Sequence, residues 1–103
     1  MITYTVEVYS DGTEKWFKNS KLHRENGPAI VYPYGPEEYY QNDKLHRENG
    51  PAIIYPDGTE AYFQNGKRLS KEEVMNPKHT ISIDGKTIEI SHESFIALKE
   101  TLK

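Results

Sequence analysis

The side chains best suited to chemistry in this sequence belong to two identical tripeptides. His23-Arg24-Glu25 and His46-Arg47-Glu48 each lie in the same octapeptide, Leu-His-Arg-Glu-Asn-Gly-Pro-Ala, at residues 22–29 and 45–52. A guanidinium binds phosphate or carboxylate groups bidentately, so Arg24 and Arg47 are candidate binding residues. The structural alternative pairs each arginine with a glutamate of its own or the adjacent copy, and each histidine with a backbone carbonyl. Because a catalytic site seldom needs two copies, the repetition favours the structural interpretation.

A second candidate is a double column of aromatic residues, aligned by the same 23-residue spacing. The columns are Trp16, Tyr39 and Tyr62, followed by Phe17, Tyr40 and Phe63. Neighbouring residues on a strand point to opposite faces, so the two columns lie on opposite sides of a sheet. The Phe-containing column is the better candidate for the core. The Trp/Tyr column is a candidate exposed strip for protein binding, unless both faces are partly covered, one of them by a C-terminal helix.

Metal binding and catalysis have less support in the sequence. The chain has no cysteine, and His23 and His46 lack the nearby carboxylate pair of a usual metal site. His79 and His92 indicate no site together. No phosphate-binding glycine loop, nucleophile elbow or His–carboxylate–nucleophile set is recognisable. We therefore expect no catalytic residue, no cofactor and no metal.

Composition narrows the class of partner. The net charge is −3 and the isoelectric point is near 5.8, which argues against a non-specific nucleic-acid binder. No apolar run approaches the length of a membrane span, and the N-terminus lacks the basic and apolar regions of a signal peptide. We expect a soluble, cytoplasmic protein without a membrane partner.

The elements that position these residues repeat three times over residues 1–69. Each copy combines a short apolar run, a glycine-containing turn and a second run with the aromatic pair, which is the pattern of a β-hairpin. The turns fall at residues 10–12, 33–35 and 56–58, and the middle turn lacks Asp-Gly, so it is expected to be looser or of another type. Asn-Gly-Pro in each octapeptide is expected to turn the chain into the next hairpin, using the conformational freedom of glycine. The prediction is an antiparallel β-meander.

Residues 70–103 predict a different unit. Ser70-Lys71-Glu72-Glu73 is a capping box for a short helix that Asn76-Pro77 ends. Alternating β-branched residues around Asp84-Gly85 predict a hairpin, and Ser91 caps a final helix that runs to about Leu102. We expect this ββα unit to cap the array by covering its last open strand edge. The predicted fold class is mainly β, and α+β overall.

The repeat resembles a known family. A 23-residue period with Asp-Gly-Thr-Glu, an aromatic pair, Asn-Gly-Lys and a basic junction is similar to the MORN repeat. It is closer still to the variant Leu-His-Arg-x-Asn/Asp-Gly-Pro-Ala repeats of small phage and bacterial proteins. The resemblance covers residues 4 to about 69 and implies an array of antiparallel hairpins. The MORN glycine after the aromatic pair is missing and His-Arg replaces His-Gly, which argues against the lipid binding proposed for some MORN proteins. The C-terminal segment resembles the endings of short phage-type proteins and implies a viral or prophage source.

Three functional hypotheses follow. The leading hypothesis is a non-enzymatic protein-binding module, encoded by a phage, that occludes a host bacterial defence protein in the host cytoplasm, as an anti-CRISPR protein does. Its candidate partner-binding residues are Trp16, Tyr39, Tyr62, Arg24 and Arg47. The second is a protein that sequesters a nucleotide or other small ligand with arginine and tyrosine side chains. The third is a structural protein that self-associates through open repeat edges, as a homodimer for example.

Overall fold

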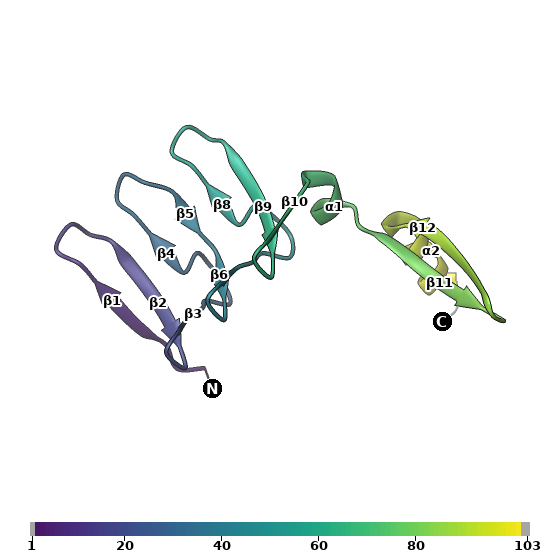
Figure 1. The fold of residues 1–103 in the computed structure, drawn as a ribbon, viewed down its shortest axis with the longest axis horizontal. Helices are drawn as coiled ribbons and strands as arrows, with labels where there is room; N and C mark the ends of the chain where they lie inside the picture. The colour runs from purple at the N-terminus through teal and green to yellow at the C-terminus, as the bar shows by residue number, and fades with distance from the viewer. Residues whose placement is uncertain (1, 102–103) are drawn as a thin grey trace.

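The structure is a computed structural model that describes residues 2–101. It is mainly β: a meander of antiparallel hairpins is followed by a short helix, a separate hairpin and a second helix (Figure 1). The molecule is elongated, with principal extents of 59 × 35 × 22 Å. Such a shape is typical of repeats that contact only their neighbours. The predicted fold class is confirmed.

The three repeats form one meandering eight-stranded sheet and a separate short hairpin. The strand order is β1-β2-β4-β5-β8-β9-β10, all antiparallel, while β3 pairs with β2, and β6 pairs with β7 in a sheet of their own. The strand bounds are β1 (Thr5–Val8), β2 (Glu14–Lys18), β3 (Lys21–Leu22), β4 (Ile30–Val31), β5 (Glu37–Glu38), β6 (Tyr40–Gln41), β7 (Lys44–Leu45), β8 (Ile53–Ile54), β9 (Glu60–Gln64) and β10 (Lys67–Leu69).

The long hairpins of the first and third repeats turn at the predicted Asp-Gly pairs. Gly12 and Gly58 have φ of +94° and +89°, a region that favours glycine. In both turns the aspartate carboxylate accepts a hydrogen bond of 2.9 Å from the backbone N–H two residues later. In the middle repeat Gly35 does not adopt a positive φ, so the turn there is of another type, as predicted.

Each repeat also contains a shorter hairpin that the sequence analysis did not predict. Both central residues of its turn have φ between 49° and 79°, which is the signature of a type I′ turn. These turns are Asn19-Ser20, Asn42-Asp43 and Asn65-Gly66. Only the third carries the Asn-Gly pair that signals such a turn strongly, and the flanking strands are two or three residues long.

The core lies at the junctions between repeats. Ala29 and Ala52, the last residues of the two octapeptides, have 0% exposure, and the isoleucine after each is also buried. The backbone N–H of Ala29 donates to the Glu38 carbonyl at 2.8 Å, so the small side chain sits where neighbouring hairpins meet. The predicted core column of Phe17, Tyr40 and Phe63 is only half-buried. That prediction is wrong because the closest packing occurs where the chain enters each new hairpin.

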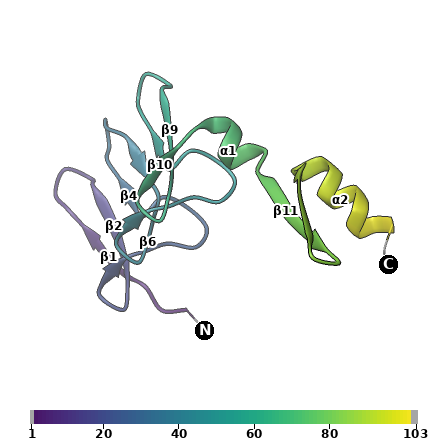
Figure 2. The ribbon, with the colours of Figure 1, turned by 45° about the vertical axis from the view of Figure 1, so that its right-hand side comes forward.

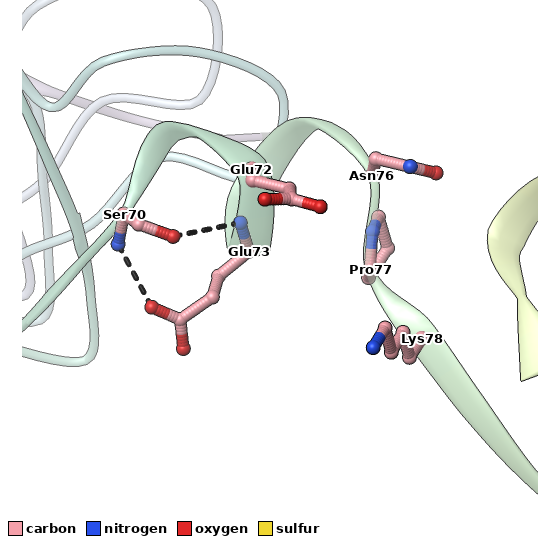
Figure 3. A pocket seen from close by; sticks show the side chains of 6 residues that line it. All are labelled: Ser70, Glu72, Glu73, Asn76, Pro77 and Lys78. Atoms are coloured by element: carbon pink, nitrogen blue, oxygen red, sulfur yellow. Dashed lines mark hydrogen bonds between the residues drawn. The ribbon is translucent and has the colours of Figure 1, made fainter. Parts of the chain in front are cut away.

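The short helix α1 (Lys71–Met75) packs against the last repeat. Its capping box is formed as predicted: the Glu73 backbone N–H donates to Ser70 Oγ at 3.1 Å, and the Ser70 N–H donates to Glu73 Oε1 at 2.9 Å (Figure 3). Val74 is buried, and α1 contacts β9. A cavity of about 460 Å³ is lined by Ser70, Glu72, Glu73, Asn76, Pro77 and Lys78 (Figure 3).

The second hairpin and helix form a separate unit. β11 (Lys78–Ile83) and β12 (Lys86–Ser91) pair with each other around Asp84-Gly85, and α2 (His92–Thr101) packs against both. Figures 1 and 2 show this unit beyond α1, away from the repeats. We expected it to cover the last strand edge, whereas α1 makes the contact with the last repeat. The predicted helix end near Leu102 lies outside the described residues, and no helix within residues 2–101 is long and apolar enough to cross a membrane.

The capping box makes the stability of α1 depend on pH. The hydrogen bond from the Ser70 backbone holds the pKa of the Glu73 carboxyl below its ordinary value of 4.5. A carboxylate with a lowered pKa stabilises the folded state above its ordinary pKa, and the stabilisation is lost as the pH falls through the lowered value. We therefore expect α1 to fray as the pH falls through the lowered pKa of Glu73, and the Glu73→Gln variant to lose this pH-dependent step. The Cα chemical shifts of residues 71–75 would measure this fraying. Glu72→Gln is the control and should keep the pH-dependent step.

Candidate functional site

Arg24 and Arg47 are each packed against an aromatic ring. The guanidinium carbon Cζ of Arg24 lies 3.6 Å from the centroid of the Trp16 ring, and that of Arg47 lies 4.0 Å from the centroid of Tyr39. A terminal nitrogen of each guanidinium also donates a hydrogen bond of 3.2 Å to the carbonyl of the proline four residues later. The octapeptide thus fixes its own arginine over an aromatic residue eight positions earlier in the chain.

The octapeptide glycines provide space for these guanidinium groups. A Cβ atom added at Gly27 or Gly50 would lie 3.0 Å from Cζ of Arg24 or Arg47, closer than ordinary van der Waals contact. Neither glycine has a positive φ. The prediction that conformational freedom explains the glycine in Asn-Gly-Pro is therefore wrong. Glycine is needed because the arginine side chain returns over the backbone of its own loop.

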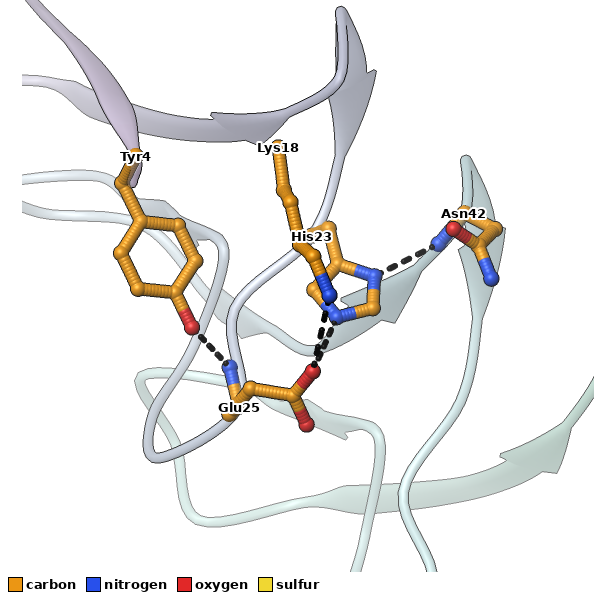
Figure 4. Close-up of polar contacts among 5 residues, drawn as sticks. All are labelled: Tyr4, Lys18, His23, Glu25 and Asn42. Atoms are coloured by element: carbon orange, nitrogen blue, oxygen red, sulfur yellow. Dashed lines mark hydrogen bonds and ion pairs between the residues drawn. The ribbon is translucent and has the colours of Figure 1, made fainter. Parts of the chain in front are cut away.

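His23 and His46 are buried, with 5% and 8% exposure, and they connect one repeat to the next. His23 Nε2 lies 2.7 Å from Glu25 Oε1, and the backbone N–H of Asn42 donates to His23 Nδ1 at 3.1 Å (Figure 4). The same contacts recur around His46 at 2.7 and 2.9 Å. Because Nδ1 accepts, the proton of the neutral ring is on Nε2, which donates to the glutamate. Both ring nitrogens are used within the protein.

The structural interpretation of the tripeptides assigned the wrong partner to both the arginine and the histidine. Glutamate pairs with histidine, and the backbone carbonyl accepts from arginine. In extended chain, residues two apart point to the same side, which brings His23 to Glu25 and directs Arg24 elsewhere. The hydrogen bond from His23 is the main reason why the pKa of the Glu25 carboxyl is lowered, with Lys18 at 3.7 Å adding to the effect.

A cleft of about 380 Å³ lies between the two octapeptide loops. Its lining includes both arginines, Tyr39, Gln41 and the Glu-Asn pair of each loop. None of the ion pairs formed within residues 2–101 includes Arg24 or Arg47. The cleft therefore presents two guanidinium groups whose charge is not neutralised by a carboxylate contact.

Four of the five predicted site residues converge in two pairs. Trp16 with Arg24 and Tyr39 with Arg47 are half-buried stacks in successive repeats, and both arginines line the cleft. Tyr62 is different, with 7% exposure. Its repeat has Ser70 where the other two have arginine, and α1 packs against its strand. The predicted exposed strip is therefore interrupted at the third repeat.

A second histidine contact was missed by the sequence analysis. His79 Nε2 and His92 Nδ1 lie 2.8 Å apart, and the His79 ring stacks on Phe95 with centroids 4.1 Å apart. The register of β11 with β12 pairs Lys78 with Ser91, so the first residue of α2, His92, lies near His79. Counting outward from Asp84-Gly85 pairs His79 with Ile90, two residues before His92, and so would have placed the two histidines near each other. Within residues 2–101 no three His, Cys, Asp or Glu side chains form a cluster that could hold a metal ion.

The chain was also compared with known proteins. No family model, curated protein or solved structure matches it. The resemblance to the MORN repeat therefore stays a prediction.

Proposed function

We propose that this protein is a non-enzymatic protein-binding module that uses the cleft and its two arginine–aromatic stacks as the recognition surface. The observation that carries the proposal is the pair of guanidinium groups held against Trp16 and Tyr39 without a carboxylate partner among the described residues. Arginine and aromatic side chains are enriched among the residues that dominate binding energy at protein interfaces. Side chains that are already held in place lose less entropy on binding.

Two observations favour a protein partner over a nucleotide. A nucleobase stacks on a free aromatic face, whereas the guanidinium groups already occupy a face of Trp16 and Tyr39, and Tyr4 contacts Trp16 edge-on at 5.4 Å. Glu25 and Glu48 line the same cleft and would repel a compact polyanion. A folded protein surface with separated charges suits such a lining better.

The finer proposal is that the module is a phage-encoded inhibitor that occludes a bacterial defence protein, such as a CRISPR effector, in the host cytoplasm. Its support is the resemblance of the repeats and the C-terminal segment to small phage proteins. Occlusion needs a shaped surface and no catalytic group.

The proposal predicts that the stacks matter for binding more than for folding. We expect Tyr39→Ala and Trp16→Ala each to weaken partner binding at least about tenfold, the effect of losing an interface anchor. Because both rings are half-buried, melting temperatures should fall by only a few degrees. The measurement is affinity capture from a bacterial lysate, followed by calorimetry with the identified partner. Tyr55→Ala, which removes an exposed tyrosine outside the cleft, is the control. Unchanged affinity with a large loss of stability would show that Trp16 and Tyr39 belong to the core and not to the binding surface.

A further inference from the structure

We infer that the cleft recognises two carboxylate groups on an acidic segment of the partner protein, one at each arginine. The inference rests on the proposed function and adds the chemistry of recognition. Three observations support it. Arg24 and Arg47 have N–H donors that no described residue accepts from, and their side chains are held in place against aromatic rings. The neighbouring glutamates are paired with histidines.

The guanidinium groups keep most of their donors. The arginine side chain has five N–H donors in one plane, and each of these two guanidinium groups donates one hydrogen bond among the described residues, to the carbonyl of Pro28 or Pro51. The contact with Trp16 or Tyr39 places Cζ 3.6 or 4.0 Å from the ring centroid and is not a hydrogen bond, so it leaves the remaining N–H donors without a partner among the described residues. A carboxylate accepts two such donors side by side, which is the strongest geometry for this pair.

The side chains are also positioned before any partner arrives. Each guanidinium lies against a ring and so close to a glycine that a Cβ there would be only 3.0 Å away. A free arginine loses much rotamer entropy when it is fixed, and here the loop has already fixed it. The two loops have the same sequence, so the same donor arrangement is presented twice along the array.

The neighbouring glutamates are kept away from the arginines by the buried histidines. Glu25 and Glu48 accept hydrogen bonds of 2.7 Å from His23 and His46, and neither glutamate forms an ion pair with arginine. The histidine thus removes the nearest competitor for the guanidinium. These glutamates still line the cleft, so they disfavour closely spaced phosphates more than two separate carboxylates.

The test is an NMR titration of the labelled full-length chain with a hexaglutamate peptide, read at the Nε–H signals of the arginine side chains. We expect saturable shifts for Arg24 and Arg47 and no shift for Arg68, the exposed arginine of β10. Salt of about 1 M should abolish the shifts, because it screens charges beyond ~3 Å. Equal shifts at Arg68, no shifts at all, or tighter binding of inorganic phosphate or ATP would overturn the inference.

Two variants separate charge from placement. Arg47→Ala should weaken hexaglutamate binding about tenfold, as expected for the loss of one charge-assisted pair, whereas Arg68→Ala should not. Gly50→Ala keeps every charge but places a Cβ 3.0 Å from the guanidinium, which must shift; it should therefore weaken binding with the Arg47 Nε–H signal displaced in the free protein. Unaltered binding by both Arg47→Ala and Gly50→Ala would refute the role of the stack.

The same variants distinguish this inference from the proposed function. If the captured partner binds with sensitivity to Tyr39→Ala but not to Arg47→Ala, the protein-binding proposal stands and the carboxylate inference fails. If hexaglutamate binds as expected but the identified partner is insensitive to all cleft variants, the carboxylate site stands and the proposed recognition surface fails.

Discussion

The His46→Ala variant is expected to lose about 3 kcal/mol of unfolding free energy, a large effect for one substitution in a small protein. The imidazole has 8% exposure, donates to Glu48 and accepts from the backbone N–H of Asn65 at 2.9 Å. Alanine leaves a cavity and deprives a backbone N–H of its acceptor at the junction of the second and third repeats. Urea unfolding followed by circular dichroism measures the loss.

Two isosteric variants identify which hydrogen bond matters. The amide oxygen of asparagine can take the place of Nδ1, whereas the amide of glutamine reaches the place of Nε2. We expect His46→Asn to keep more stability than His46→Gln, because the hydrogen bond from the Asn65 backbone is part-buried, whereas the Glu48 carboxylate is exposed to water. The reverse order would show that the histidine–glutamate contact is the stabilising one. His79→Ala, at a half-buried position outside the repeats, is the control.

Tyr62→Ala is expected to cost about 3 kcal/mol, the lower end of the range for a buried aromatic residue. Tyr62 has 7% exposure and lies on β9, where α1 packs. Tyr62→Phe removes only the hydroxyl, which donates a 3.3 Å hydrogen bond to Glu60, and should cost about 0.5 kcal/mol.

The half-buried Tyr39 provides the comparison within the same column. If Tyr62→Ala and Tyr39→Ala have equal effects on the urea midpoint, burial by α1 does not distinguish the third repeat from the second. If the Tyr62→Ala variant unfolds like the unaltered chain but fails to bind the partner, Tyr62 is part of the recognition surface.

Local signals in the sequence predicted most of the fold. The Asp-Gly turns, the capping box at Ser70 and Glu73 and the hairpin around Asp84-Gly85 each depend on residues only a few positions apart. Their conformational preferences act within one turn of chain, so the pattern alone identifies them. The type I′ turn at Asn19-Ser20 was missed because serine is a weaker signal than glycine at its second position.

The site was harder to predict because its contacts join different parts of the sequence. The donor to His23 Nδ1 is Asn42, 19 residues away in the next repeat. Whether an aromatic residue is covered by arginine, as Trp16 is, or by a helix, as Tyr62 is, depends on the segment that follows its repeat. The residue types of the site could be chosen from the sequence, but their partners required the register of neighbouring hairpins.

The histidine contacts give the array a direction. Each imidazole belongs to one octapeptide and accepts the N–H at the turn of the following repeat, so every repeat except the first receives such a contact from its predecessor. At the equivalent position after the third repeat the chain has Leu69, which offers no acceptor, and α1 begins two residues later. Histidine thus occupies this position wherever another repeat follows, and leucine occupies it after the third repeat.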